Sequence, residues 1–168
     1  MELPRRPIQI AAGALLASAF VTMVLGAFVK AIGGGMACPE WPTCIEGQAW
    51  PEFSTLGIAA EMTHRVSASL VILSGIALLY LEFTQYRSER GLLGLTAIAG
   101  GLVGLQVVLG ALTIFYNLHP VIVTSHLAVA TLIFGFTLVI AQRVWKLPPP
   151  KASEAVAPTP APEGAEPG

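Results

Sequence analysis

The sequence predicts an all-α integral membrane protein, a bundle of four transmembrane helices built from two similar helical hairpins. Apolar residues make up 54% of the 168 residues and charged residues only 11%, whereas about a quarter of a soluble domain is charged. The mean hydropathy is +0.71. Four apolar stretches are each long enough to cross a hydrocarbon core, which takes roughly 20 helical residues.

The expected spans are separated by short polar or proline-rich segments. They run over Ile8–Val29, Ser54–Phe83, Leu92–Tyr116 and Val121–Val144. Residues 1–147 are therefore expected to form one membrane domain, with a long loop at residues 30–53. Residues 148–168 are rich in Pro, Ala, Glu and Gly. They are expected to form a disordered tail, because they cannot bury enough apolar surface to order themselves.

The third span is rich in glycine and contains Gly100-x-x-x-Gly104. Glycines at this spacing let another backbone approach closely. We expect them to pack tightly inside the bundle; the alternative is a dedicated dimer face.

Basic residues gather on one side of the spans: Arg5, Arg6, Arg87, Arg90, Arg143, Lys146 and Lys151. By the positive-inside rule, both termini are then cytoplasmic and the loop at residues 30–53 faces outward. The alternative is a signal peptide cleaved after Ala19, although the apolar run continues from Phe20 to Val29. The net charge of −1 gives no basic face, which excludes a nucleic-acid partner.

The outer loop holds both cysteines, in Cys38-Pro-Glu-Trp-Pro-Thr-Cys44. On the oxidising side of the membrane such a pair can persist as a disulfide, either structural or redox-active. Free thiols are the alternative. Metal binding would need further soft ligands, and the loop has no histidine.

Two histidines lie inside apolar spans, where ionisable side chains are costly and point to function. His64 lies 19 residues before Phe83, and His126 lies 18 before Val144. At 1.5 Å per helical residue, both lie about 27–29 Å from the inner boundary. Two histidines at matched depth on different helices could hold one planar group between them.

A weak internal repeat supports the pairing of His64 with His126. Val24-Leu-Gly-Ala27 and Val108-Leu-Gly-Ala111 each precede a helix that carries a hydroxyl residue, His, and Ala four places on. The pattern favours bis-histidine haem ligation between facing helices. Histidines that serve only as core hydrogen-bonding groups remain the alternative. Zinc would need a third ligand, and a di-iron site would need a second Glu-x-x-His pair.

Other polar residues accompany the histidines. Glu61 lies one helical turn before His64, so it could act as an acid or base there. It could instead pair with Arg65, although we expect these two to share a helix face poorly. Arg65 is expected either to hold a haem propionate or to extend toward the membrane surface. Gln106 is expected to satisfy a polar neighbour within the third span.

Several of these segments together closely resemble heme A synthases. They are Leu25–Cys44 with its Cys-Pro-Glu-Trp-Pro-Thr-Cys loop, Glu61-Met-Thr-His-Arg65, Gln106-Val-Val-Leu-Gly-Ala-Leu-Thr113, and the stretch around His126. The resemblance covers all four expected spans. The cysteine loop combined with Glu-x-x-His-Arg is specific, whereas either motif alone would be weak.

The resemblance implies an oxidoreductase that oxidises the C8 methyl group of heme O to the formyl group of heme A through successive hydroxylations, for the cytochrome oxidase cofactor. Glu61 would be the catalytic carboxylate. His64 and His126 would ligate the haem iron, with Arg65 as a further haem-binding residue. Cys38 and Cys44 would form the family's outer-loop disulfide. The expected location is the plasma membrane of a prokaryote, with the cysteine loop on the extracytoplasmic side.

This chain departs from the family in size. The commoner members have eight spans in two similar halves and a resident haem b, whereas this chain resembles one half. We therefore expect a homo-oligomer, with heme O synthase and cytochrome oxidase assembly factors as further partners. A non-enzymatic b-type cytochrome or haem carrier is the alternative function.

Overall fold

The computed structural model describes residues 6–45, 48 and 50–149. These residues form four long helices, α1 (Arg6–Ala31), α2 (Leu56–Gln85), α3 (Arg90–Phe115) and α4 (Pro120–Trp145), and a short 3-10 helix, η1 (Gly34–Met36). Each long helix is long and apolar enough to cross a membrane. The predicted fold is confirmed, with span boundaries that differ by at most two residues. Most of the predicted tail, residues 150–168, lies outside the described residues.

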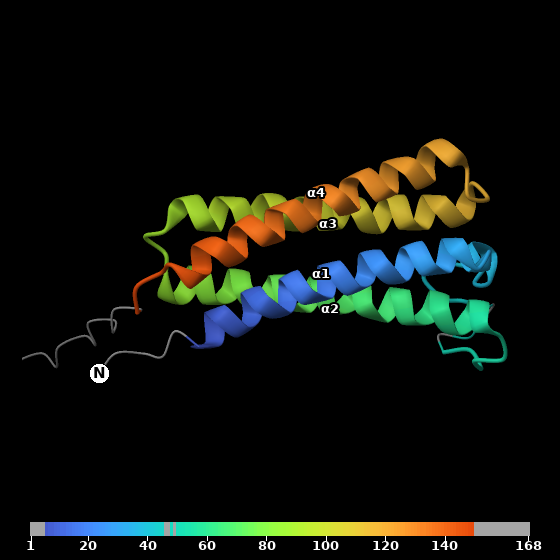
Figure 1. Cartoon of the computed structure of the whole chain (residues 1–168), viewed down its shortest axis with the longest axis horizontal. Helices are drawn as coiled ribbons and strands as arrows, with labels where there is room; N and C mark the ends of the chain where they lie inside the picture. Colours follow the sequence, from blue (N-terminus) through green and yellow to red (C-terminus); the bar gives the residue numbers. More distant parts are fainter. Residues whose placement is uncertain (1–5, 46–47, 49, 150–168) are drawn as a thin grey trace, which may run out of the picture.

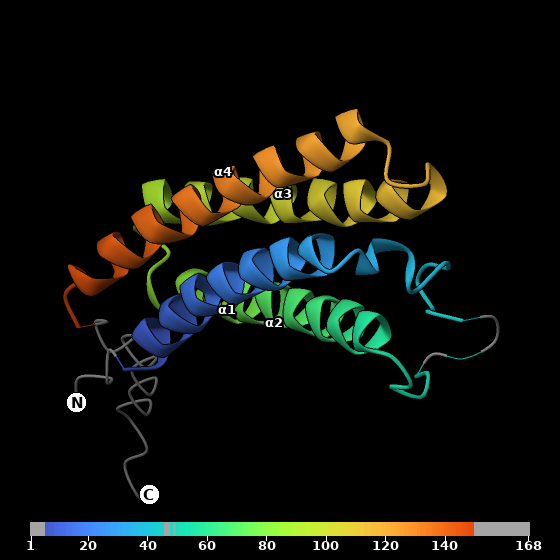
Figure 2. The same ribbon diagram turned by 45° about the vertical axis from the view of Figure 1, so that its right-hand side comes forward.

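The helices form two antiparallel hairpins that pack on each other (Figure 1). The first hairpin is α1 with α2, which make the most extensive helix contact, and the second is α3 with α4. Across the bundle, α1 packs on α4 and α2 packs on α3. The turned view in Figure 2 places the described loop residues that follow α1 at the end of the bundle opposite the first turn of α1.

An N-cap hydrogen bond and a tight turn define the helix ends on the side of the cysteine loop. The predicted second span begins at Ser54, whereas α2 begins at Leu56 because Thr55 is its N-cap. The Thr55 side chain accepts a hydrogen bond of 3.2 Å from the backbone N–H of Ile58. The turn between α3 and α4 is tight, with Leu118 at φ 58°. A Cβ placed on Gly35 of η1 would lie 3.0 Å from Leu118 Cδ1, so the turn of the second hairpin packs on the loop of the first.

The packed hydrophobic core lies in the half of the bundle away from the cysteine loop. It draws on all four helices: Ile8, Ala11, Ala12, Leu15, Ala19, Val71, Leu78, Leu92, Ala99, Ile140 and Val144. A separate small cluster of Cys38, Cys44, Ile58 and Met62 lies under the loop. In α4 no buried residue precedes Ile133. Among the described residues, the first half of α4, which carries His126, therefore has no fully buried side chain.

A buried polar pair joins α2 to α3 in the core half. Glu82 is 0% exposed, and its Oε1 accepts a hydrogen bond of 2.8 Å from the Thr96 hydroxyl. Among the described residues, Glu82 Oε2 is buried with no hydrogen-bond partner. The carboxyl group is thus part of the core rather than of the membrane surface.

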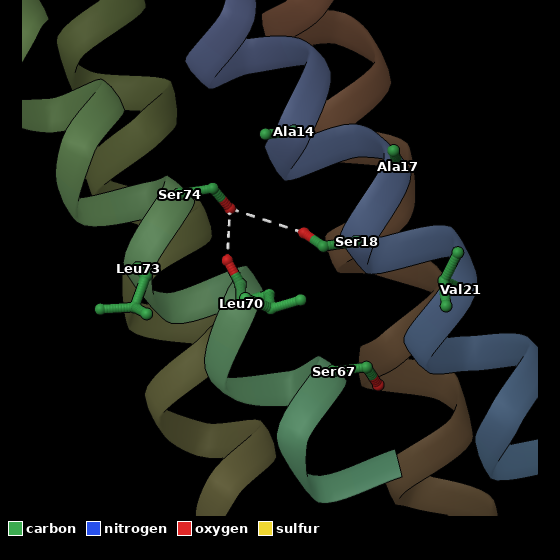
Figure 3. Close-up of a pocket in the computed structure, with 8 residues that line it drawn as sticks. All are labelled: Ala14, Ala17, Ser18, Val21, Ser67, Leu70, Leu73 and Ser74. Carbon is green, nitrogen blue, oxygen red and sulfur yellow. Dashed lines mark hydrogen bonds between the residues drawn. The ribbon is translucent and has the colours of Figure 1, made fainter. Parts of the chain in front are cut away.

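Small residues let α1 and α2 approach closely along their seam. A groove of about 520 Å³ runs there, lined by Ala14, Ala17, Ser18, Val21, Ser67, Leu70, Leu73 and Ser74 (Figure 3). The hydroxyls of Ser18 and Ser74 lie 3.5 Å apart across the seam. Hydrogen bonds between hydroxyls thus accompany van der Waals packing, as is common between helices in lipid.

Gly100 and Gly104 of α3 do not pack as expected. A Cβ on Gly94, Gly100, Gly101 or Gly104 would meet nothing within 4 Å in the described part of the chain. The prediction that Gly100-x-x-x-Gly104 packs tightly inside the bundle is therefore wrong, because this face of α3 points away from the other helices.

Candidate functional site

His64 packs directly on the backbone of α1. A Cβ on Gly26 would lie only 2.9 Å from His64 Cε1, so only glycine leaves room for the ring in this position. Nδ1 of His64 lies 3.0 Å from the carbonyl oxygen of Thr22. Because a carbonyl only accepts, Nδ1 carries the proton and donates it, and Nε2 keeps a free lone pair.

A short hydroxyl chain supports this arrangement. Thr22 Oγ1 donates to Ser67 Oγ at 2.9 Å, and Ser67 Oγ donates to the carbonyl oxygen of His64 at 2.8 Å. Ser67 is 6% exposed. The turn of α1 that holds the imidazole is thereby tied to the turn of α2 that carries it.

His126 has the corresponding position in the second hairpin. A Cβ on Gly110 of α3 would lie 3.3 Å from His126 Cε1. The amide nitrogen of Gln106 lies 3.4 Å from His126 Nε2. Because an amide N–H donates, it faces the lone pair of Nε2. Within the described residues, Nδ1 of His126 and Oε1 of Gln106 are buried without hydrogen-bond partners.

The Val-Leu-Gly-Ala repeat thus corresponds to a repeated packing arrangement in the structure. Gly26 and Gly110 are the glycines of the two Val-Leu-Gly-Ala segments, and each lies beside the histidine of the following helix. Thr22 and Gln106 each lie four residues earlier, and each contacts that histidine. Both hairpins therefore place an imidazole on the matching glycine, although Thr22 contacts Nδ1 of His64 and Gln106 contacts Nε2 of His126.

The donor set suits a haem better than a bare metal ion. The described residues contain no group of three or more His, Cys, Asp or Glu side chains that could hold a metal. A haem needs only axial protein ligands. A ring N–H bonded to a backbone carbonyl, as in His64, is the usual support of a metal-ligating histidine.

Glu61 and Arg65 form an ion pair on α2. Arg65 Nε lies 3.1 Å from Glu61 Oε1, and the Glu61 residue is only 8% exposed. The expectation that they share a face poorly is wrong, because residues four apart are neighbours on a helix. Glu61 lies three residues before His64, about 4.5 Å along the helix axis.

Arg65 also binds the cysteine loop. Its Nη1 donates to the carbonyl oxygens of Glu40 at 3.0 Å, Pro42 at 3.5 Å and Thr43 at 2.8 Å. Its Nη2 donates to the carbonyl oxygen of Cys38 at 3.3 Å. Of the two expected positions, the side chain takes the outward one, since it reaches the loop beyond the helix ends. A contact with a haem propionate stays a prediction.

The loop is closed by a disulfide between Cys38 and Cys44. Both cysteines are 0% exposed, so the predicted pair is confirmed and free thiols are excluded. The disulfide packs on Ile58 and Met62 of α2. It thus lies directly beside the segment that carries Glu61 and His64.

Sequence reasoning missed three contributors to the site. The Thr22 contact is made by a backbone carbonyl, which no side-chain motif reveals. Gly26 and Gly110 were noticed only as parts of a repeat, although glycine at matched positions before two matched histidines is itself a signal of close approach.

Comparisons of the sequence with known proteins identify its family and relatives. A family model described as "Cytochrome oxidase assembly protein" matches residues 9–163. The heme A synthase of Oceanobacillus iheyensis is 29% identical over 131 residues, which cover 72% of this chain and 40% of that protein. The heme A synthase of Geobacillus thermodenitrificans is 28% identical over 142 residues, covering 82% and 44%.

The matched part is therefore less than half of these relatives, since it spans 40% and 44% of their lengths. The family match, by contrast, extends over nearly all of the chain, from residue 9 to residue 163. The matched range contains the cysteine loop and both histidine helices described above. On these grounds, the chain belongs to the cytochrome oxidase assembly protein family, with heme A synthases among its relatives.

Proposed function

We propose that this chain is a compact heme A synthase that binds heme O between its two hairpins and oxidises the C8 methyl group to the formyl group of heme A. The proposal rests on one observation above all: two matched imidazoles are each placed on a glycine of the preceding helix, and a buried carboxylate lies one helical turn before one of them. The basic residues at the other end of the spans support an extracytoplasmic position for the disulfide loop.

His64 and His126 are the proposed axial ligands of the haem iron. His64 is ready for this role, because the Thr22 carbonyl holds its Nδ1–H and leaves Nε2 free. His126 contacts Gln106 through Nε2, so the amide must turn away before Nε2 can bind iron. When bound, the haem supplies the redox-active iron, and the chain fixes its position.

Glu61 is the proposed acid and base. Its contact with Arg65 is made by Oε1, and a carboxylate has further acceptor sites on Oε2. Oε2 can therefore take a proton from one hydroxyl of the diol and return it to the other, which leaves as water and forms the formyl group. The low exposure of Glu61, 8%, keeps bulk water away from that exchange.

The test is haem extraction and mass analysis from membranes that express the chain with a supply of heme O. The wild type should yield heme A or its hydroxylated precursor. Glu61→Gln preserves the shape of the side chain but cannot act as a base, so it should bind haem and form no formyl group. Glu89→Gln, at an exposed glutamate in the turn between α2 and α3, is the matched control and should retain the activity.

Each outcome separates the candidate functions. Heme A from the wild type and the Glu89 variant, but not from the Glu61 variant, supports the enzyme. Unmodified haem in all three would support a b-type cytochrome or haem carrier instead. Equal heme A yields from all three would remove Glu61 from the mechanism.

A further inference from the structure

The Arg65 guanidinium is the link between the disulfide loop and the proposed catalytic carboxylate. It binds Glu61 through Nε and four loop carbonyls through Nη1 and Nη2. The guanidinium is a rigid planar fork of N–H donors. Its position therefore determines the relative placement of the loop and Glu61.

The loop carbonyls converge on Arg65 because the chain between the cysteines is folded back on itself. The acceptors belong to Cys38, Glu40, Pro42 and Thr43, which all lie within the ring closed by the disulfide. The disulfide closes this segment, and four of the segment's backbone oxygens point to one guanidinium. The disulfide thus maintains the carbonyl cage, and the cage holds the guanidinium.

Burial raises the cost of breaking this contact. The Arg65 and Glu61 side chains are 16% and 10% exposed, so neither charge is well solvated by water. A charge that loses water must be compensated by hydrogen bonds and a counter-charge. Arg65 receives both, the carbonyls from the loop and the carboxylate from α2. If either the loop carbonyls or the carboxylate is removed, the buried guanidinium is left poorly paired, which costs free energy.

We propose that Arg65 is a positioning residue that fixes Glu61 against the cysteine loop, and that the Cys38–Cys44 disulfide acts on the site through it. The inference rests on the proposed function, in which Glu61 exchanges the protons. Besides closing the loop, the disulfide then has a second role, which is to hold Arg65 in place beside Glu61. It also assigns Arg65 a role other than holding a haem propionate.

The first experiment measures how readily the disulfide of the purified chain, residues 1–168, is reduced by dithiothreitol, with thiols counted by alkylation and mass analysis. Coupling is reciprocal: if the disulfide holds Arg65, then Arg65 must hold the disulfide. Arg65→Gln should therefore speed reduction about tenfold, because it removes charge-assisted hydrogen bonds to the loop. Arg65→Lys should give a smaller effect, because an ammonium group keeps the charge but lacks the planar fork.

Glu61→Gln belongs in the same series and should also speed reduction, although Glu61 makes no hydrogen bond to the loop in the described residues. Arg87→Gln is the matched control. Arg87 lies at the opposite end of α2, over the Phe83 ring at 4.6 Å, so its loss should leave the rate unchanged. Equal reduction rates in the wild type, Arg65→Gln and Glu61→Gln would overturn the proposal.

The second experiment separates positioning from substrate binding. With heme O as substrate, Arg65→Gln and the double variant Cys38→Ser/Cys44→Ser should both lower kcat. Their KM, and their affinity for iron protoporphyrin IX in a titration, should stay within about twofold of the wild type. Because both act through one contact, the triple variant should lose no more than either alone. A raised KM with unchanged kcat in Arg65→Gln would overturn the proposal in favour of a propionate contact.

The two experiments distinguish an error in the proposed function from an error in the proposed coupling. A wild type that forms no heme A contradicts the proposed function, whereas the reduction rates still decide whether Glu61, Arg65 and the disulfide are coupled. Retained binding of iron protoporphyrin IX in each variant shows that it has folded.

Discussion

His64 lies against the Cα of Gly26 so closely that a methyl group there would be 2.9 Å from its Cε1. The contact sets the ring at the one place where Nδ1 reaches the carbonyl oxygen of Thr22. Glycine is unfavourable in a helix interior, by roughly 0.5–1 kcal/mol relative to alanine. Its presence at residue 26 is therefore explained by the imidazole rather than by the helix.

Gly26→Ala should displace the His64 ring and break its hydrogen bond to Thr22. We expect the affinity for haem to fall at least about tenfold, as for other losses of support to a metal ligand. The visible spectrum in a titration with iron protoporphyrin IX measures both the affinity and the fraction with two histidine ligands. Gly101→Ala is the control, because a Cβ there meets nothing within 4 Å in the described chain. Equal affinities in the two variants would contradict this account of Gly26.

Gly110→Ala should have the same effect on His126, but a weaker one. The Cβ would lie 3.3 Å from Cε1, against 2.9 Å at Gly26, so a small movement of the ring can relieve the contact. The expected order of haem affinities is Gly101→Ala, then Gly110→Ala, then Gly26→Ala. The same titration gives this order, and a larger loss at Gly110 than at Gly26 would contradict the geometric argument.

The sequence predicted the four spans well because hydropathy and helix length are properties of contiguous residues. It could not predict which face of α3 points inward, because lipid-facing and buried positions are equally apolar. The Glu61–Arg65 pair could have been predicted from its spacing of four residues. The contacts of Arg65 with the loop could not, since their acceptors are backbone oxygens 22 to 27 residues away.

Gln106→Leu should raise the affinity for haem. In the structure the Gln106 amide faces the lone pair of His126 Nε2, and iron binding through Nε2 must displace it. Leucine has a similar size and offers no such competition. A typical hydrogen bond contributes about 0.5–1.5 kcal/mol, so the expected gain is roughly 2–10-fold. Gln142→Leu, at an exposed glutamine of α4, should change nothing. A weaker affinity in Gln106→Leu would mean that the amide orients His126 instead of competing for it.

The buried Glu82–Thr96 pair should affect the free energy of unfolding but not the affinity for haem. Thr96→Val removes the hydroxyl that donates to Glu82 Oε1, and Oε2 already has no partner in the described residues. The carboxyl group would then be buried with neither oxygen satisfied. We expect the free energy of unfolding to fall by about 1–3 kcal/mol, measured by thermal unfolding in one detergent.

The double variant Glu82→Leu/Thr96→Val tests the cause of that loss. Both polar groups are then replaced by apolar side chains of similar size, within a core that already contains Leu78, Leu92 and Ile140. Such a replacement is often neutral or stabilising, because no buried polar atom is left without a partner. The double variant should therefore be at least as stable as the wild type and bind iron protoporphyrin IX with the same affinity. A double variant less stable than Thr96→Val alone would mean that Glu82 has favourable interactions beyond this hydrogen bond. A lower affinity would mean that the core half of the bundle influences the histidine site.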